Sequence, residues 1–228
     1  MTSGGQSIPP NLPIPRRSSL LPDYQRDWPE YYTAVEGKPP RDTLLRALSL
    51  FEEEWSQERL ALDVGCGSGR DAHELLKRGW SVWASDSNEL SEKLTLAGAP
   101  PGTSERLTYI RCTMEALPGH SQVPRGLALI NASFALPFCQ PESFPAVWSW
   151  IGETLVPGGR FAGQFFGDRD EWACVRPKSH FTRAELETLL TGWSIEHLEE
   201  VEKEGDDATG KPKYHHVFHV VVRKSSAP

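Results

Sequence analysis

One segment carries more structural information than any other in this chain, and it reads Leu62-Asp63-Val64-Gly65-Cys66-Gly67-Ser68-Gly69-Arg70-Asp71. Its apolar start is typical of a short buried strand, and the glycines that follow lead into the start of a helix. Glycine permits positive φ and lacks the Cβ that keeps a ligand at a distance, while the free N–H groups of a helix start attract a carboxylate or phosphate. The segment therefore predicts a strand, a ligand-binding turn and a helix.

An acidic residue, Asp86, ends the next expected strand. An aspartate in this place can accept hydrogen bonds from both ribose hydroxyls of an adenine-containing ligand. The dehydrogenase fingerprint is G-x-G-x-x-G, and here Arg70 stands where its third glycine would be. The residues thus predict a nucleoside-like ligand, and the spacing makes an NAD-dependent enzyme the weaker alternative.

Strands and helices alternate on both sides of this segment. We expect strands over 60–64, 81–85, 107–112, 127–132 and 160–166, and helices over 43–56, 71–78, 146–155 and 183–190. Residues 193–202 and 214–223 flank an acidic, glycine-bearing loop and predict an antiparallel hairpin. Such alternation is typical of a parallel sheet covered on both faces. We therefore expect an α/β fold that is Rossmann-like and doubly wound, with a mostly parallel seven-stranded sheet, a C-terminal antiparallel hairpin and helices on both faces.

Length and composition limit the class of protein. The chain has 228 residues, 38% of them hydrophobic and 24% charged, which is typical of one globular domain with appended segments. The net charge of −7 argues against a nucleic-acid partner, and no apolar run is long enough to span a membrane. Four widely spaced cysteines indicate neither a zinc ribbon nor a disulfide framework, so we expect a cytoplasmic protein. We also expect it to be monomeric or homodimeric.

Changes in amino-acid composition divide the chain into three parts. Residues 1–22 are rich in proline and predict a flexible leader, residues 23–224 form the domain, and residues 225–228 are a tail. Within the domain, residues 23–42 crowd several aromatic side chains together before the first core helix. We expect this part to cover the active site.

Together with Asp63, Asp86 and the later Leu155-Val156-Pro157-Gly158-Gly159, the glycine loop resembles motif I of the class I S-adenosylmethionine-dependent methyltransferases. The resemblance spans about residues 40–224. It implies that S-adenosylmethionine is the cofactor and S-adenosylhomocysteine the product. Thr113 departs from the family pattern because an aspartate usually stands there. The cofactor-binding residues that the resemblance implies are Asp63, Gly65, Cys66, Gly67, Gly69, Asp86, Ser87, Thr113, Met114 and Asn131.

Methyl transfer from a sulfonium requires the acceptor to lie opposite the departing sulfur, in a site largely closed to water. Three segments are expected to reach that site, and their candidate substrate contacts are Tyr31, Tyr32, Phe134, Phe166 and Trp172. The catalytic residue stays unknown, with His180 and Asp168 as candidates. We expect no metal, because His215 and His219 of one strand stand roughly 13 Å apart at about 3.3 Å per residue.

Within this class, the compact layout is similar to the small-molecule methyltransferases of the tellurite-resistance and thiopurine groups. The expected function is methyl transfer from S-adenosylmethionine to a small-molecule acceptor by in-line displacement. An RNA or protein methyltransferase, and a non-catalytic cofactor-binding domain of the same fold, stay open as alternatives. The sequence does not identify the acceptor, its nucleophilic atom, a general base or the pathway.

Overall fold

The computed structural model of this chain describes residues 27–54, 57–175 and 178–225. The expected leader (1–22), the first residues of the expected cover (23–26) and the end of the tail (226–228) lie outside that part of the chain.

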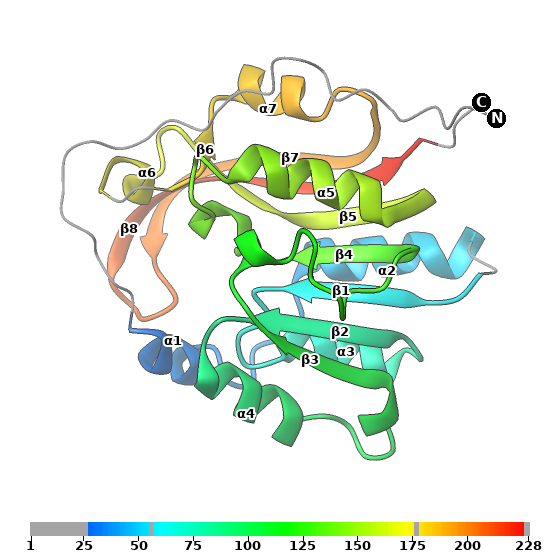
Figure 1. The fold of residues 1–228 in the computed structure, drawn as a ribbon. Coiled ribbons are helices and arrows are strands. Elements are labelled where there is room, and N and C mark those ends of the chain that lie inside the picture. Colours follow the sequence, from blue (N-terminus) through cyan, green and yellow to red (C-terminus); the bar gives the residue numbers. More distant parts are fainter. Residues whose placement is uncertain (1–26, 55–56, 176–177, 226–228) are drawn as a thin grey trace.

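A single mixed sheet forms the middle of the molecule, with the strand order β3-β2-β1-β4-β5-β8-β7 and a short β6 that pairs with β5 (Figure 1). The first five strands are mutually parallel, while β8 runs antiparallel to both β5 and β7. This confirms the predicted Rossmann-like arrangement with its terminal hairpin. The strands are β1 (Leu60–Val64), β2 (Ser81–Asp86), β3 (Leu107–Arg111), β4 (Leu127–Ala132), β5 (Leu155–Gly167), β6 (His180–Phe181), β7 (Trp193–Asp206) and β8 (Pro212–Lys224).

Helices pack on both faces of the sheet, as predicted. They are α1 (Trp28–Ala34), α2 (Asp42–Glu54), α3 (Arg70–Lys77), α4 (Glu89–Ala97), α5 (Phe144–Thr154), α6 (Glu171–Val175) and α7 (Arg183–Leu189). Among the described residues, none of the helices has the length and apolar character needed to cross a membrane.

Side-chain caps explain where several helices begin. The Asp27 carboxylate accepts a hydrogen bond from the Glu30 N–H at the start of α1, and the Asn88 side chain accepts one from the Leu90 N–H at the start of α4. Such caps satisfy N–H groups that have no partner within the helix. These two helices, α1 and α4, were not predicted from the sequence. Their caps are the local signal that marks where they begin.

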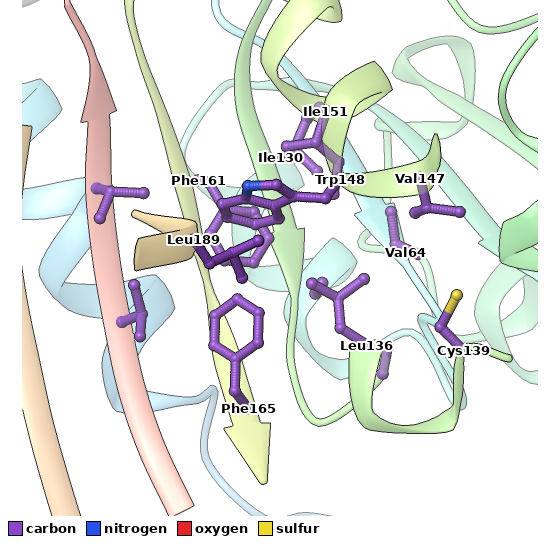
Figure 2. Packing of buried hydrophobic residues seen from close by; sticks show 14 of the residues in the cluster. Val64, Ile130, Leu136, Cys139, Val147, Trp148, Ile151, Phe161, Phe165 and Leu189 are labelled. Atoms are coloured by element: carbon purple, nitrogen blue, oxygen red, sulfur yellow. The ribbon is translucent and has the colours of Figure 1, made fainter. Parts of the chain in front are cut away.

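Alternate residues of the central strands point to opposite faces, so the sheet separates two apolar clusters. Ala61 faces α2 and α3, whereas Leu62 and Val64 face α5 and α7. On the second face Trp148 of α5 lies against Phe161 of β5, with ring centroids 5.0 Å apart (Figure 2). These packed faces fix the positions of the strand ends, where the functional side chains lie.

Three parts of the fold depart from the expected element boundaries. Strand β5 begins at Leu155 rather than at residue 160, and the hairpin strands β7 and β8 extend well past their expected ends toward the turn. The aromatic segment after residue 27 is a short helix, α1, which was not predicted although Trp28, Tyr31 and Tyr32 stand at the helical spacing i, i+3, i+4. Figure 1 shows the tip of the β7–β8 hairpin next to α1, and Lys211 at that tip lies 3.9 Å from the Glu30 carboxylate.

Candidate active site

A cavity of about 1560 Å³ opens where the parallel strands end. Its lining includes Gly65 after β1, Asp86 at the end of β2, Cys112 after β3, Ser133 after β4 and Phe166 near the end of β5. In open α/β sheets this edge is where ligands bind. A pocket for one drug-sized ligand measures about 300–1,000 Å³, so this cavity has room for two ligands.

The glycine loop forms one wall of the cavity. Gly65, Gly67 and Gly69 all have positive φ, at 64°, 58° and 82°. A Cβ on Gly65 would lie 2.6 Å from the Ala135 Cβ, so no larger residue fits there without movement. The loop is thus held in a left-handed conformation that only glycine adopts without strain.

Asp86 connects the glycine loop to the end of β2. Its carboxylate accepts hydrogen bonds from the Gly67 N–H at 3.1 Å and from the Asn88 N–H at 3.0 Å. Burial raises the pKa of Asp86, while these backbone N–H groups oppose that rise. Asp86 and the neighbouring Ser87 both line the cavity, so the carboxylate's remaining lone pairs are available for hydroxyl donors.

A buried polar network lies behind the loop. The Asn131 amide donates to the Asp63 carboxylate at 2.8 Å and to the Asp71 carboxylate at 3.1 Å, and the Arg41 N–H donates to Asp71 at 3.1 Å. Asn131 is completely buried and does not line the cavity. It therefore holds the two carboxylates in place rather than meeting a ligand.

Asp63 keeps one buried carboxylate oxygen, Oδ2, without a hydrogen-bond partner. Burial, with the nearby Asp71 carboxylate, raises the pKa of Asp63 to about 8. Asp63 lines a small hollow of about 40 Å³, and Tyr31, Val35, Gly65, Gly67 and Ser133 line both this hollow and the main cavity. An unsatisfied buried acceptor is costly, so a cationic donor that reaches this hollow would relieve it.

The end of β3 provides another part of the wall. Cys112, Thr113 and Met114 all line the cavity, and Thr113 precedes the short 3₁₀ helix Met114–Ala116. The Glu115 carboxylate accepts a hydrogen bond from the Gln140 N–H at 3.0 Å. This wall combines apolar surface with few charges, which suits a flat heterocycle.

Cys66 and Gly69, which were also predicted to bind the cofactor, do not line the main cavity. Cys66 is half-buried and lines only the small hollow, with its sulfur 3.6 Å from the Ser91 hydroxyl. Gly69 begins α3 and lines neither space; a Cβ there would meet His73 at 2.8 Å. Both residues shape the loop from behind.

Helix α1 lies across the glycine loop. The Tyr32 ring is so close to Gly67 that a Cβ there would lie 3.3 Å from it, and Tyr32 is only 4% exposed. Its neighbour Trp28 packs against Phe138, with centroids 5.3 Å apart. The aromatic side chains of α1, Tyr31 included, therefore roof the cavity.

Phe134, directly after β4, has a strained backbone. Its φ of 54° makes it the one non-glycine residue with positive φ in the described part of the chain. The Phe134 N–H donates to the Gln164 side chain at 2.9 Å, and the Arg41 guanidinium lies 4.5 Å from the ring centroid. Strain of this kind collects at functional sites. Arg41 is half-buried in the cavity wall.

Beyond Phe134, the cavity ends in an aromatic floor. Phe166 packs edge-on against Trp172 with centroids 5.9 Å apart, and Phe138 lies 6.3 Å from Phe166. Two buried lysines reach this floor: Lys178 Nζ lies 3.1 Å from the Phe138 centroid, and Lys213 Nζ lies 4.6 Å from the Trp172 ring centroid. The two lysines were missed because nothing near them in the sequence marks them.

The two candidate catalytic residues lie away from the cavity lining. His180, in β6, is 7% exposed and its Nδ1 lies 3.0 Å from the Lys178 carbonyl oxygen. Asp168 lies 3.4 Å from the Arg169 guanidinium and 3.6 Å from the His216 ring. Neither side chain lines the cavity.

The hairpin supplies a polar wall that sequence reasoning did not find. The cavity is lined by alternate residues of its two strands, namely His197, Glu199, Val201 and Lys203 of β7 and Lys213, His215, Val217 and His219 of β8. Alternation places one set of strand residues on one face. The available signal was that three of the four alternating residues on each strand are polar. Burial lowers the pKa of His219, whose ring lies 6.2 Å from that of Phe134.

One cluster of the described residues has the donor types of a metal site: Glu200, Glu202 and His216. The Arg169 guanidinium already bonds to Glu202 and lies 3.3 Å from Glu200 and 3.4 Å from His216. This cation neutralises the carboxylates, so the cluster is an ion-pair network that joins the loop after β5 to the hairpin.

Residues 61–159 match the family model described as "Methyltransferase domain". Methyltransferase ptaI of Pestalotiopsis fici is 26% identical over 168 residues, which cover 69% of this chain and 48% of that protein. The chain thus spans about half the length of the curated relative it matches.

Solved structures of other proteins share the fold of this chain. TehB of Haemophilus influenzae superposes with a TM-score of 0.62 at 20% identity, covering 79% of this chain and 62% of TehB. The 1,6-didemethyltoxoflavin-N1-methyltransferase of Burkholderia thailandensis, solved with 1,6-didemethyltoxoflavin and S-adenosylhomocysteine, gives a TM-score of 0.60 at 22% identity, covering 87% and 85%. At these identities the likeness shows a shared fold.

Proposed function

Because residues 61–159 match the methyltransferase domain model and the sheet is Rossmann-like with a C-terminal antiparallel hairpin, we propose that this chain transfers a methyl group from S-adenosylmethionine to a small-molecule acceptor. The observation that carries the proposal is the pair of carboxylates on either side of the glycine loop. Asp63 presents an unpartnered buried oxygen on one side, and Asp86 lines the cavity on the other.

The residues present fit this cofactor. An ammonium group suits the Asp63 Oδ2, two ribose hydroxyls suit Asp86, and an adenine ring suits the wall formed by Cys112, Thr113 and Met114. S-adenosylmethionine supplies a methyl group on a sulfonium and its own leaving group. We assign Asn131 the role of holding Asp63, since its amide hydrogens are spent on Asp63 and Asp71.

For the transfer step, the protein has to orient the acceptor and keep out water. Phe134 lines the cavity, and its neighbour Ala135 lies against the Cβ position of Gly65, so the Phe134 ring can position an acceptor beside the cofactor. Helix α1 and the hairpin tip, linked by Glu30 and Lys211, close the opposite side. We accordingly keep residues 27–42 as the described part of the proposed cover, and Tyr31, Tyr32, Phe134, Phe166 and Trp172 as its acceptor contacts.

We propose a cytoplasmic protein, monomeric or homodimeric, that does not act on nucleic acid; the net charge of −7 supports the last point. Size-exclusion chromatography with light scattering tests the oligomeric state. Methylation of bulk RNA that rises steeply as the salt concentration falls would contradict a small-molecule acceptor.

Calorimetric titration tests the cofactor proposal directly. S-adenosylmethionine and S-adenosylhomocysteine are expected to bind, and NAD is not, because the glycine spacing suits one adenosine without a pyrophosphate. Incubation with labelled S-adenosylmethionine and a metabolite extract then identifies the methylated product. Tight NAD binding without any response to the other two ligands would overturn the proposal.

A further inference from the structure

Two ammonium groups converge on the same two aromatic rings at the far end of the cavity. Lys178 Nζ lies 5.9 Å from the Phe166 centroid and 5.7 Å from that of Trp172. Lys213 Nζ lies 5.2 Å and 4.6 Å from the same two centroids. Both lysines line the cavity although they are only 3% and 5% exposed. Lysine is rarely buried to this extent, so the arrangement calls for a physical reason.

Burial lowers the pKa of Lys213, and the hydrogen bond to its carboxylate partner opposes that shift. That partner, Asp170, is fully buried and lies 2.6 Å from Lys213 Nζ. Asp170 also accepts hydrogen bonds from the Trp172 and His216 N–H groups, so it is fixed in place. The carboxylate therefore anchors Lys213 at the cavity wall.

The Lys213 ammonium has one N–H donor more than the partners that the structure shows for it. It carries three N–H groups, and the structure shows partners for two of them, Asp170 at 2.6 Å and His215 Nδ1 at 3.4 Å. The remaining donor and the Lys178 ammonium border the same aromatic floor. An anion bound beside these two ammonium groups would offset the cost of burying their charges and receive charge-assisted hydrogen bonds.

We propose that the methyl acceptor is an anionic aromatic compound, whose ring packs on Phe138, Phe166 and Trp172 and whose carboxylate or phenolate oxygen contacts Lys178 and Lys213. This inference rests on the proposed function, since it names the substrate class of the same cavity. An ionised oxygen that accepts the methyl group forms the new C–O bond with its own lone pair, and the C–S bonding pair stays on sulfur. No proton has to leave, which agrees with the positions of His180 and Asp168 outside the cavity lining.

The test compares 2-naphthoate with 2-naphthamide, which have nearly the same shape and differ in charge. Calorimetric titration of each, with and without S-adenosylhomocysteine, is expected to show about 10-fold tighter binding of the carboxylate, because hydrogen bonds to charged groups are stronger than neutral ones. Lys178→Met is expected to reduce the preference to less than about 3-fold. Lys93→Met is the matched control, since that exposed lysine pairs with Glu89 outside the cavity.

A second variant guards against loss of folding. Lys213→Met alone would leave the buried Asp170 carboxylate without its cation, so the double variant Lys213→Met/Asp170→Asn is used, with thermal unfolding as the check. It should lose the preference as Lys178→Met does.

Equal binding of both probes, no binding of the carboxylate, or a preference that survives in both variants would overturn this inference. Binding of S-adenosylhomocysteine in that case leaves the proposed function intact. A charge preference without any S-adenosylhomocysteine binding overturns the proposed function and retains the anion site.

Discussion

The two ends of the cavity are built in different ways. The cofactor end comes from one continuous βαβ unit, in which Asp63, the glycine loop and Asp86 all lie between residues 60 and 86. The acceptor end combines α1, the turns after β4 and β5, the segment at Lys178 and the inner face of the hairpin. Cofactor binding therefore depends on a local motif, whereas the choice of acceptor depends on segments that only the folded chain brings together.

The largest expected effect is at the cofactor end, in Gly65→Val. A side chain there must adopt positive φ, which costs about 1–3 kcal/mol, and would collide with Ala135. S-adenosylhomocysteine binding, measured by calorimetry, is expected to weaken about 100-fold or more, since this strain adds to the steric overlap. Binding of 2-naphthoate at the acceptor end should change much less.

Gly102→Val is the matched control for that variant. Gly102 has φ of 76° and open space around its Cβ position, so the substitution carries the backbone strain without the collision. If both variants lose cofactor binding equally, the glycine loop is not the binding surface.

Asp86→Ala should weaken S-adenosylhomocysteine binding by about 1.5–3 kcal/mol, the range for hydrogen bonds to a charged group. The change also removes the acceptor of the Gly67 N–H. Glu89→Ala, an exposed position in the next helix, serves as the control. A dissociation constant equal to that of the wild type would mean that the ribose binds elsewhere.

Asp63 should make cofactor binding release protons. Its pKa is raised from 3.8 to about 8, so at pH 6.5 the folded protein keeps that proton until the ligand's ammonium group arrives. Titrations in buffers of different ionisation enthalpy should then show release of up to one proton, and Asp63→Asn should remove it. A release unchanged in Asp63→Asn would assign it to another group.

The same shift has a defined effect on stability. Between pH 4 and pH 8 the folded state holds more protons at Asp63 than the unfolded state does. The free energy of unfolding should therefore fall as pH rises through that window. Asp63→Asn should flatten this slope in pH-dependent thermal unfolding, and an unaltered slope would contradict the assignment.

The smallest effect is expected at the acceptor end, for His180→Ala and Asp168→Asn. Neither side chain lines the cavity, so turnover should change by less than about 3-fold. A loss of about 10²–10⁴-fold, as for a true general base, with the fold intact by circular dichroism, would place that residue in the reaction and point to a neutral acceptor.

Much of the cofactor end could be predicted from residues alone. Asp63, Gly65, Gly67 and Asp86 are close in sequence and have a spacing that only a strand, turn and helix can satisfy. Asn131 was predicted as a contact from its place after the fourth strand, yet its amide faces the buried carboxylates. Which way a side chain at a strand end points depends on its packing, and the sequence pattern does not contain that information.

The acceptor end could be predicted only in part. Tyr32, Phe134, Phe166 and Trp172 were expected near the site, but Lys178 and Lys213 were not. Helix α1 was not predicted because its helical spacing of aromatic residues covers only two turns, and so short a helix depends on its cap and on tertiary packing.

The sequence by itself determined the alternation of strands and helices, the glycine loop and its acidic partner, since each rests on interactions between near neighbours along the chain. That two lysines from distant segments both lie near the Trp172 ring followed only from the packing of the folded chain. The same packing decided that Asp170 anchors one of them. The physical reason is that burial and charge pairing are properties of the packed molecule, and a chain pattern does not specify which distant side chains share a desolvated space.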